Sequence, residues 1–190
     1  MTKNSQNVKG TEEIIQALLR NKTEHIFGFP GGSVMPLYDD FLKYTDKLRH
    51  VLVRHEQAAS HAADAYARVA KKAGVCLTTS GPGATNIVTG LMSAYMDSIP
   101  VIAMSGNVPT TLLGNDAFQE TDMVGITMPI TKHNYQIRHP NEISNVFDNA
   151  FHIAQTGRPG PVFIDLPKDV QVNEVTKRKK TIIHSGFKPN

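Results

Sequence analysis

The stretch VLVRHEQAASHAADAYARV, residues Val51 to Val69, contains the transition that decides the fold. Its apolar start, Val51 to Val53, is typical of a buried strand, and the alanine-rich part that follows is typical of a helix. A single carboxylate, Glu56, lies at the junction between them. In open parallel α/β sheets, ligands bind where strands end and helices begin. Glu56 is therefore the first candidate for a functional residue.

The same alternation of apolar runs and helical patterns continues in both directions along the chain. We expect strands at residues 25–29, 50–53, 74–79, 100–106, 133–138 and 160–167. We expect helices at residues 11–20, after the glycine turn within 30–44, and at 57–72, 84–98 and 141–155, the last ending near Gly157. Such alternation predicts βαβ units. The predicted fold is a single doubly wound α/β domain with a six-stranded, mostly parallel sheet and helices on both faces.

Composition limits the class of protein. Hydrophobic residues make up 40% of the 190 residues and charged residues 19%, which is the balance of a soluble globular domain. The net charge of +3 is modest, and the basic run at 177–180 lacks a nucleic-acid recognition motif. No apolar stretch is long enough for a membrane span, and the N-terminus lacks the apolar segment of a secretory signal. We therefore expect a cytoplasmic protein without a nucleic-acid or membrane partner.

Two features bear on domain extent and redox compartment. The polar, basic segment from about Gln171 predicts a folded domain at residues 1–170 and an interdomain linker at 171–190. The single cysteine, Cys76, lies in an apolar run and is expected to be a small buried hydrophobic residue, not a nucleophile. One cysteine excludes an internal disulfide and suits a reducing compartment.

Four turns follow predicted strands and should meet at the carboxyl edge of the sheet. They are GFPGG (28–32), RHEQA (54–58), TSGPGATN (79–86) and SGNVP (105–109). Their glycines allow a ligand to approach the backbone closely. None matches a Walker phosphate loop or a G-x-G-x-x-G dinucleotide motif, and His55 and His61 are too far apart for an H-E-x-x-H zinc site. The sequence thus supports neither a nucleotide-phosphate site nor a zinc site.

The residues alone leave two interpretations of Glu56 open. A carboxylate at a helix N-terminus is favoured by the helix dipole, which would give Glu56 a structural role only. The flanking valine and alanine positions would partly desolvate the carboxylate, which is typical of a working acid or base. His55 beside it is expected to be a structural hydrogen-bonding residue.

Several motifs together resemble the N-terminal, pyrimidine-binding domain of the acetolactate synthase (acetohydroxyacid synthase) family, whose catalytic subunit uses thiamine diphosphate. They extend from about residue 8 to residue 170. RHEQAA and TSGPGATN are similar to thiamine-diphosphate enzymes in general, whereas DAFQETDMVGI and GRPGPVFIDLPKD are similar to the acetolactate synthase branch. The resemblance implies condensation of two pyruvates to 2-acetolactate, or of pyruvate and 2-oxobutyrate to 2-aceto-2-hydroxybutyrate, with release of CO2, in branched-chain amino-acid biosynthesis.

The resemblance also implies roles for particular residues. Glu56 would hydrogen-bond the N1′ nitrogen of the cofactor's pyrimidine ring and control its protonation, and Gln119 would be the other catalytic residue. The remaining cofactor-binding positions would be Phe29, Pro30, Gly31, Gly32, Pro82, Asn86 and, toward a flavin, Arg158. The substrate channel would contain Ser33, Pro109, Phe118 and Lys168, with Ser33 replacing the alanine that the family often has there. The alternative is structural: turn-forming glycines and prolines, a core Phe118, and surface charges at Arg158 and Lys168.

Further cofactors and partners follow from the same resemblance. FAD and Mg²⁺ would serve the full-length enzyme, with Mg²⁺ and the diphosphate held by a G-D-G…N motif that this chain lacks. The 190 residues alone are therefore expected to be inactive and to hold no metal. A homodimer or homotetramer is expected, with room for a small regulatory subunit. Two alternatives stay open: pyruvate oxidase or another thiamine-diphosphate carboligase or decarboxylase, and a non-catalytic dimerising interaction module.

Overall fold

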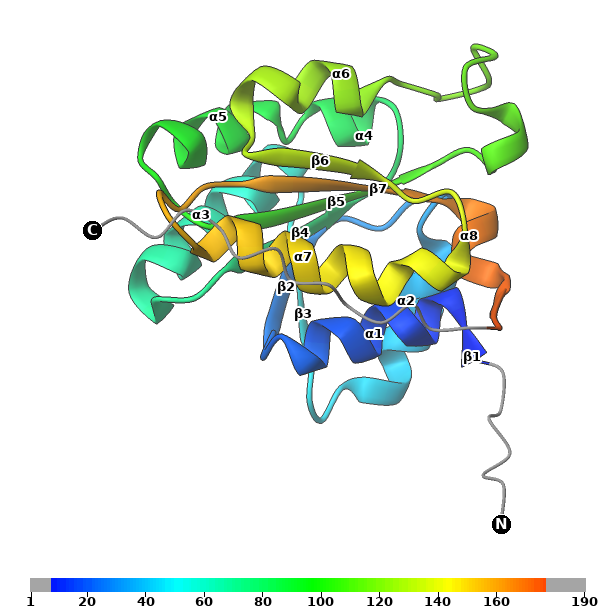
Figure 1. The fold of residues 1–190 in the computed structure, drawn as a ribbon, viewed down its shortest axis with the longest axis horizontal. Coiled ribbons are helices and arrows are strands. Elements are labelled where there is room, and N and C mark those ends of the chain that lie inside the picture. Colours follow the sequence, from blue (N-terminus) through cyan, green and yellow to red (C-terminus); the bar gives the residue numbers. More distant parts are fainter. Residues whose placement is uncertain (1–7, 177–190) are drawn as a thin grey trace.

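The structure, a computed structural model, describes residues 8–176 and is organised around a six-stranded sheet. All its neighbouring strands are parallel, in the order β3-β2-β4-β5-β7-β6 (Figure 1). The strands are β2 (His25–Gly28), β3 (Arg49–Leu52), β4 (Gly74–Thr78), β5 (Val101–Asn107), β6 (His133–Gln136) and β7 (Val162–Pro167). The predicted α/β fold with a six-stranded parallel sheet is therefore confirmed.

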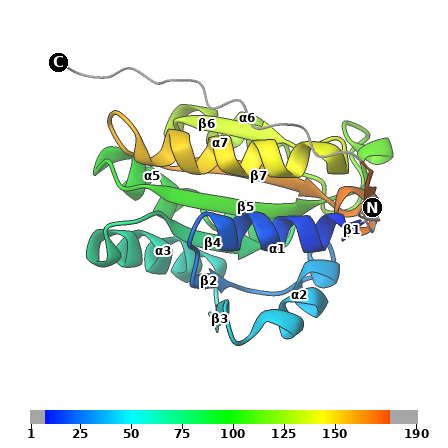
Figure 2. The same cartoon turned by 60° about the horizontal axis from the view of Figure 1, so that its bottom comes forward.

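Helices cover both faces of this sheet (Figure 1, Figure 2). One face carries α1 (Gly10–Arg20), α2 (Met35–Phe41) and α7 (Ile143–Gln155). The other face carries α3 (Glu56–Ala70), α4 (Pro82–Thr85), α5 (Val88–Met96) and α6 (Met123–Thr127). Short 3-10 helices are η1 (Leu42–Tyr44), η2 (Thr110–Leu112), η3 (Met128–Ile130) and η4 (Pro140–Glu142). The segment between β5 and β6 contains α6 and two of these 3-10 helices, η2 and η3.

The side chains of the central strands build a separate core on each face. Along β5, Ile102 and Met104 pack into the cluster formed with α1 and α7, whereas Val101 and Ala103 pack into the cluster formed with α3 and α5. Every residue of β5 is buried. A strand covered on both faces has no polar side, which explains why β5 reads as a continuous apolar run.

The apolar segment expected as one helix, residues 84–98, forms two helices, α4 and α5, with Asn86 and Ile87 between them. At this break the Ile87 N–H donates to the Ala84 carbonyl oxygen at 3.2 Å, three residues back instead of four. Such a turn is tighter than an α-helical turn and changes the direction of the chain. The apolar pattern continues across the break, so the sequence did not indicate it.

The packed fold extends past the domain boundary expected at residue 170. Gln171 lies in α8 (Lys168–Val172) and is fully buried, and β8 (Glu174–Val175) pairs antiparallel with β1 (Val8–Lys9). Residues 171–175 therefore belong to the domain and not to a linker. The polar composition of these residues did not indicate that they are part of the domain, because β8 pairs with β1 through backbone groups, which do not depend on side-chain type. The rest of the expected linker, 177–190, lies outside the described residues.

Cys76 lies on β4 and is fully buried, which raises the pKa of its thiol to about 12. The thiol stays protonated at neutral pH, so the expected role as a buried hydrophobic residue is confirmed. Within residues 8–176, no helix has both the length and the apolar character needed to cross a membrane.

The core on the α1 face makes a direct stability prediction. Leu18 is fully buried, so Leu18→Ala should lower the free energy of unfolding by about 2–5 kcal/mol through lost contacts and a cavity. Leu42, which is 74% exposed, is the matched control, and Leu42→Ala should change the free energy of unfolding by less than about 0.5 kcal/mol. Urea unfolding at equal m-values measures both. Equal losses for the two variants would contradict the assignment of α1 to the core.

Candidate functional site

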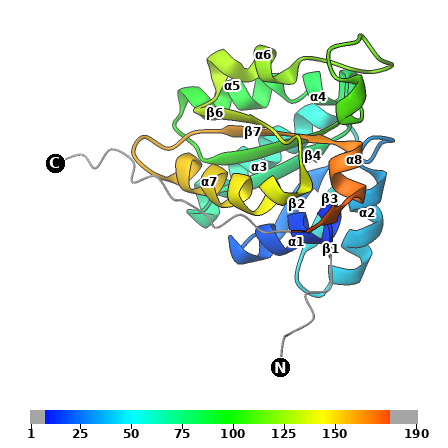
Figure 3. The ribbon, with the colours of Figure 1, turned by 45° about the vertical axis from the view of Figure 1, so that its right-hand side comes forward.

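The carboxyl ends of the parallel strands lie together at the edge of the sheet that Figure 3 brings forward. The turns after β2, β4 and β5 contact one another there. The hydroxyl groups of Ser33 and Thr79 are hydrogen-bonded at 2.9 Å, and a Cβ added to Gly106 would collide with Ser33 Oγ. The turn after β3 joins them through Glu56, as described next. The predicted meeting of the four turns is therefore confirmed.

Glu56 is the first residue of α3, but the capping group of this helix belongs to its neighbour. His55 Nδ1 accepts a hydrogen bond from the Gln57 N–H at 3.2 Å, which satisfies an N–H of the first helical turn. The Glu56 side chain is half-buried, and its Oε2 accepts from Asn86 Nδ2 at 2.9 Å. The expected structural role of His55 is confirmed, and the Glu56 carboxylate points across the edge toward the break between α4 and α5.

Glycine backbone packs closely beside this carboxylate. A Cβ added to Gly83 would lie 2.7 Å from Thr79 Cγ2 and 3.2 Å from Glu56 Oε1. A Cβ added to Gly31 would lie 2.5 Å from Thr79 Cβ. Thr79 already occupies the space that side chains at these two positions would need, so both turns can pack against it only as glycine backbone, with Gly83 also next to Glu56. Thr79 lies between them, and the sequence analysis did not single it out.

The loop between β5 and α6 brings Gln119 to the same turns. Gly81 has φ 61°, and a Cβ there would lie 2.9 Å from the Gln119 carbonyl oxygen. Gln119 itself has φ 58°, an unusual backbone for a residue with a side chain, and such strain is found preferentially at functional sites. Phe118 is 88% exposed. The alternative that Phe118 belongs to the core is therefore wrong.

The remaining predicted residues of the carboxyl edge lie in or beside these turns. Phe29, Pro30, Gly32 and Pro82 are exposed there, and Pro109 follows β5 as the residue preceding η2. Lys168 is the first residue of α8 and lines a separate hollow of about 230 Å³ with Met35 and Pro36. The structure thus brings these positions to one edge, with Lys168 in its own hollow.

Arg158 lies at the opposite, amino edge of the sheet. Its Nε donates to Ser98 Oγ at 2.7 Å and its Nη2 donates to the Met96 carbonyl oxygen at 3.2 Å. Arg158 therefore caps the C-terminal end of α5, where a cation is favoured by the helix dipole. The structure does not bring Arg158 to the residues around Glu56, and its expected contact with a flavin stays a prediction.

A buried carboxyl group, Asp165, lies at the ends of β5, β6 and β7, and the sequence analysis missed it. Its Oδ2 accepts from Asn107 Nδ2 at 2.8 Å and from Gln136 Nε2 at 2.9 Å, while its Oδ1 has no partner among the described residues. Burial raises the pKa of Asp165 to about 6, a rise that the two amide hydrogen bonds reduce and the charge of Asp122 increases. The sequence contained one indication of this residue: Asp165 is the only acid in the otherwise apolar run VFIDLP.

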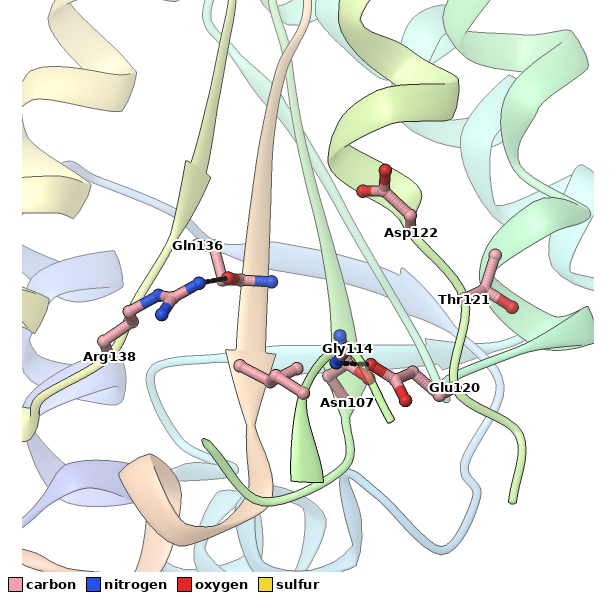
Figure 4. A pocket seen from close by; sticks show the side chains of 8 residues that line it. Asn107, Gly114, Glu120, Thr121, Asp122, Gln136 and Arg138 are labelled. Carbon is pink, nitrogen blue, oxygen red and sulfur yellow. Dashed lines mark hydrogen bonds between the residues drawn. The ribbon is translucent and has the colours of Figure 1, made fainter. Parts of the chain in front are cut away.

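The two amides that bind Asp165 also line a hollow of about 290 Å³ (Figure 4). Gln136 Oε1 accepts from Arg138 Nη2 at 2.9 Å on one side, and Glu120 binds the Gly114 N–H on another. The full lining is Asn107, Leu113, Gly114, Glu120, Thr121, Asp122, Gln136 and Arg138. The hollow therefore borders the loop that carries Gln119.

These features define the class of protein: a ligand-binding α/β domain whose site lies at the carboxyl edge of a doubly wound parallel sheet. Residues 8–126 match the family described as "Thiamine pyrophosphate enzyme, N-terminal TPP binding domain", and the chain belongs to this family. The resemblance found in the sequence is confirmed at this level.

Three relatives illustrate the similarity. The chain is 58% identical over 186 residues to the probable acetolactate synthase large subunit of Methanocaldococcus jannaschii, covering 96% of this chain and 31% of the relative. It is 51% identical over 187 residues to the acetolactate synthase of Arthrospira platensis, covering 96% and 32%. It is 52% identical over 170 residues to the acetolactate synthase large subunit of Corynebacterium glutamicum, covering 90% and 27%. The chain thus spans about 30% of the length of these relatives.

The edge around Glu56 fits the pyrimidine end of thiamine diphosphate. Asn86 occupies Oε2 of the carboxylate, and Oε1 accepts no hydrogen bond from residues 8–176. Gly31 and Gly83 pack as bare backbone against Thr79 beside this carboxylate, and a Cβ added to Gly32 would meet no atom within 4 Å. A carboxylate oxygen beside glycine backbone suits a flat ring whose nitrogen exchanges a proton. It does not suit a phosphate group, because the carboxylate and the phosphate are both negatively charged and repel each other.

The pKa of Asp165 makes the stability of the fold depend on pH. Because its folded value of about 6 lies above its ordinary value of 3.8, its stabilising contribution is complete below about pH 4 and is lost as the pH rises through about 6. Between about pH 4 and about pH 7, the unfolding free energy of the wild type should therefore fall by up to about 3 kcal/mol relative to Asp165→Asn. Denaturant unfolding across this range measures the difference. Parallel pH profiles for the two proteins would contradict it.

Proposed function

We propose that this chain serves as the pyrimidine-binding part of an acetolactate synthase. The reaction would join two pyruvates to 2-acetolactate, or pyruvate and 2-oxobutyrate to 2-aceto-2-hydroxybutyrate, with loss of CO2. The observation that carries the proposal is the Glu56 carboxylate, held by Asn86 at 2.9 Å beside the glycine turns. The names of relatives that match at least 90% of the chain support the choice of reaction. The activity is proposed for this domain together with the further parts that those relatives contain.

Glu56 would hold and move the proton. The hydrogen bond from Asn86 Nδ2 to Oε2 fixes the orientation of the carboxylate and leaves Oε1 to exchange a proton with the pyrimidine nitrogen N1′. Half-burial of Glu56 shields the carboxylate partly from water. Thiamine diphosphate, when bound, supplies the electron sink that the carbon chemistry needs. The protein's part at this edge is orientation and proton control.

The surrounding turns would orient the ring and border the substrate. Gly31, Gly32, Pro82 and Gly83 offer backbone surface to the ring, with Phe29 and Pro30 beside them. Gln119 lies against the glycine turn through its backbone, so its side chain and that of exposed Phe118 would border the reacting carbon and the substrate. Ser33, Pro109 and Lys168 would lie farther along the substrate's path. These roles are the part of the proposal that rests on motif similarity.

The complete enzyme would need more than these residues. We propose FAD and Mg²⁺ as its further cofactors, held mainly by other domains, with Arg158 reaching the flavin. A homodimer or homotetramer, joined by a small regulatory subunit, would be the working assembly, and the cytoplasm its location. The family membership and the relatives' names support these additions only indirectly.

A chimera tests the proposed function directly. In it, residues 8–176 of this chain would replace the matching part of the Methanocaldococcus jannaschii large subunit, to which the chain is 58% identical. We expect acetolactate formation from pyruvate that requires thiamine diphosphate, because the transferred domain carries the complete Glu56 site. A folded chimera that binds the cofactor and forms no acetolactate would refute the proposal. Oxidation or simple decarboxylation of pyruvate would favour the corresponding relatives of this enzyme class.

Within this chimera, Glu56→Gln should lower turnover by about 10²–10⁴-fold, the usual range for loss of a general acid or base. Glutamine has the same size and can keep the Asn86 contact, so thermal stability and cofactor affinity should change little. Glu24→Gln is the matched control, because Glu24 precedes β2 at the amino edge and pairs with Lys72 at 2.8 Å. Steady-state turnover at saturating cofactor measures both variants. Equal turnover of Glu56→Gln and the parent would leave Glu56 a purely structural residue.

A further inference from the structure

Ser33 occupies the point where three of the edge turns meet. Its Oγ is hydrogen-bonded to Thr79 Oγ1 at 2.9 Å and also accepts the Ser80 N–H at 2.9 Å. Ser80 is 5% exposed, so its N–H depends on Ser33 for a partner in place of water. An alanine at position 33 would leave this buried N–H without its acceptor.

The backbone of Ser33 is held from a different direction. Its carbonyl oxygen accepts from Gln171 Nε2 at 2.8 Å, and the same amide nitrogen donates to the Leu166 carbonyl oxygen at 2.8 Å. Gln171 is fully buried in α8, so this contact ties the glycine turn after β2 to the end of β7. The Ser33 side chain is therefore held against the turn after β4, where the Ser33 N–H also donates to Thr79 Oγ1 at 3.4 Å, and its carbonyl group is held against the end of β7.

Thr79 passes this constraint on to the residues beside Glu56. Its hydroxyl is engaged by Ser33, and its methyl carbon Cγ2 lies 2.7 Å from the place where a Cβ on Gly83 would be. The same Gly83 position lies 3.2 Å from Glu56 Oε1. Rotation of the Thr79 side chain would exchange its hydroxyl and methyl groups, so the hydrogen bond to Ser33 determines which group faces Gly83.

We propose that Ser33 is a positioning residue which, through Thr79, sets the spacing between the glycine turn at 30–32 and the turn at 81–83. In this way it orients the backbone next to the Glu56 carboxylate. The effect on cofactor binding rests on the proposed function, whereas the mechanical link between the turns does not. Ser33 does not hydrogen-bond the Glu56 carboxylate itself, and it acts through Thr79.

Amide hydrogen exchange tests the link in the cofactor-free chain. Ser33→Ala should speed exchange of the Ser80 amide by roughly 10-fold, because its acceptor is lost. Ser144→Ala is the matched control: Ser144 is a buried serine whose hydroxyl accepts a hydrogen bond, from Arg20 Nη2 at 2.8 Å, but it lies on α7. It should leave Ser80 exchange unchanged. Unchanged Ser80 exchange in folded Ser33→Ala would overturn the proposal.

A double-mutant cycle in the chimera tests the positioning role. Ser33→Ala and Thr79→Val should each weaken thiamine diphosphate binding by about 2- to 10-fold. The double variant should have about the same affinity as the single variant that binds more weakly, because both changes break the same link. Thr79→Ser, which keeps the hydroxyl, should restore most of the affinity lost in Thr79→Val. Additive losses, or affinities equal to the parent, would overturn the positioning role even if Ser80 exchange changes as expected.

The two measurements separate this inference from the proposed function. If the parent chimera does not bind thiamine diphosphate, the proposed function fails, while faster Ser80 exchange in the cofactor-free Ser33→Ala chain still supports the link between the turns. If Ser33→Ala does not fold, Thr79→Val is the variant to measure, because valine has the shape of threonine and lacks only its hydroxyl group. Thr79→Val should then weaken binding in the chimera, and full affinity would contradict the inference.

Discussion

The parallel pairing of β2, β4 and β5 is the constraint on which the candidate site depends. Parallel strands place all their carboxyl ends at one edge, so turns that are far apart in the chain are brought together. The register fixes how close they come: Gly28 pairs with Leu77, and Thr78 pairs with Ser105. Because of this register, the residues that follow β2 and β4, Ser33 and Thr79, lie within one hydrogen bond of each other.

A sheet can hold its turns in register only if both faces are packed. Here the two clusters of buried side chains lie on opposite faces, and the strands between them contribute alternate residues to each. Such close-packed interiors resist small displacements, since a shift of any layer opens voids or causes overlap. The edge inherits this rigidity, which helps to keep the orientation that the hydrogen bond from Asn86 gives the Glu56 carboxylate.

Polar contacts at the edge are of two kinds, with different consequences. The Glu56–Asn86 pair is half-buried and keeps one carboxylate oxygen available, which suits chemistry. The Asp165 carboxyl is nearly fully buried, with two amides on one oxygen, which suits the joining of three strands. Desolvation disfavours the charge on Asp165 more than the amide bonds stabilise it, so its pKa rises. The same residue type thus has two roles that only its surroundings distinguish.

The sequence by itself determined the alternation of strands and helices, the parallel sheet, the turns at its carboxyl edge and Glu56 as their acid. These follow from short-range periodicity and from motifs, which local sequence contains. Only the tertiary structure decided which distant residues lie together: Thr79 between two glycines, Ser33 bound to both the turn after β4 and α8, and Asp165 beneath its amides. It also placed Arg158 at the opposite edge. It also decided that residues 171–175 belong to the fold. Hydrogen bonds and steric contacts between residues far apart in sequence depend on strand order and register, which no local pattern specifies.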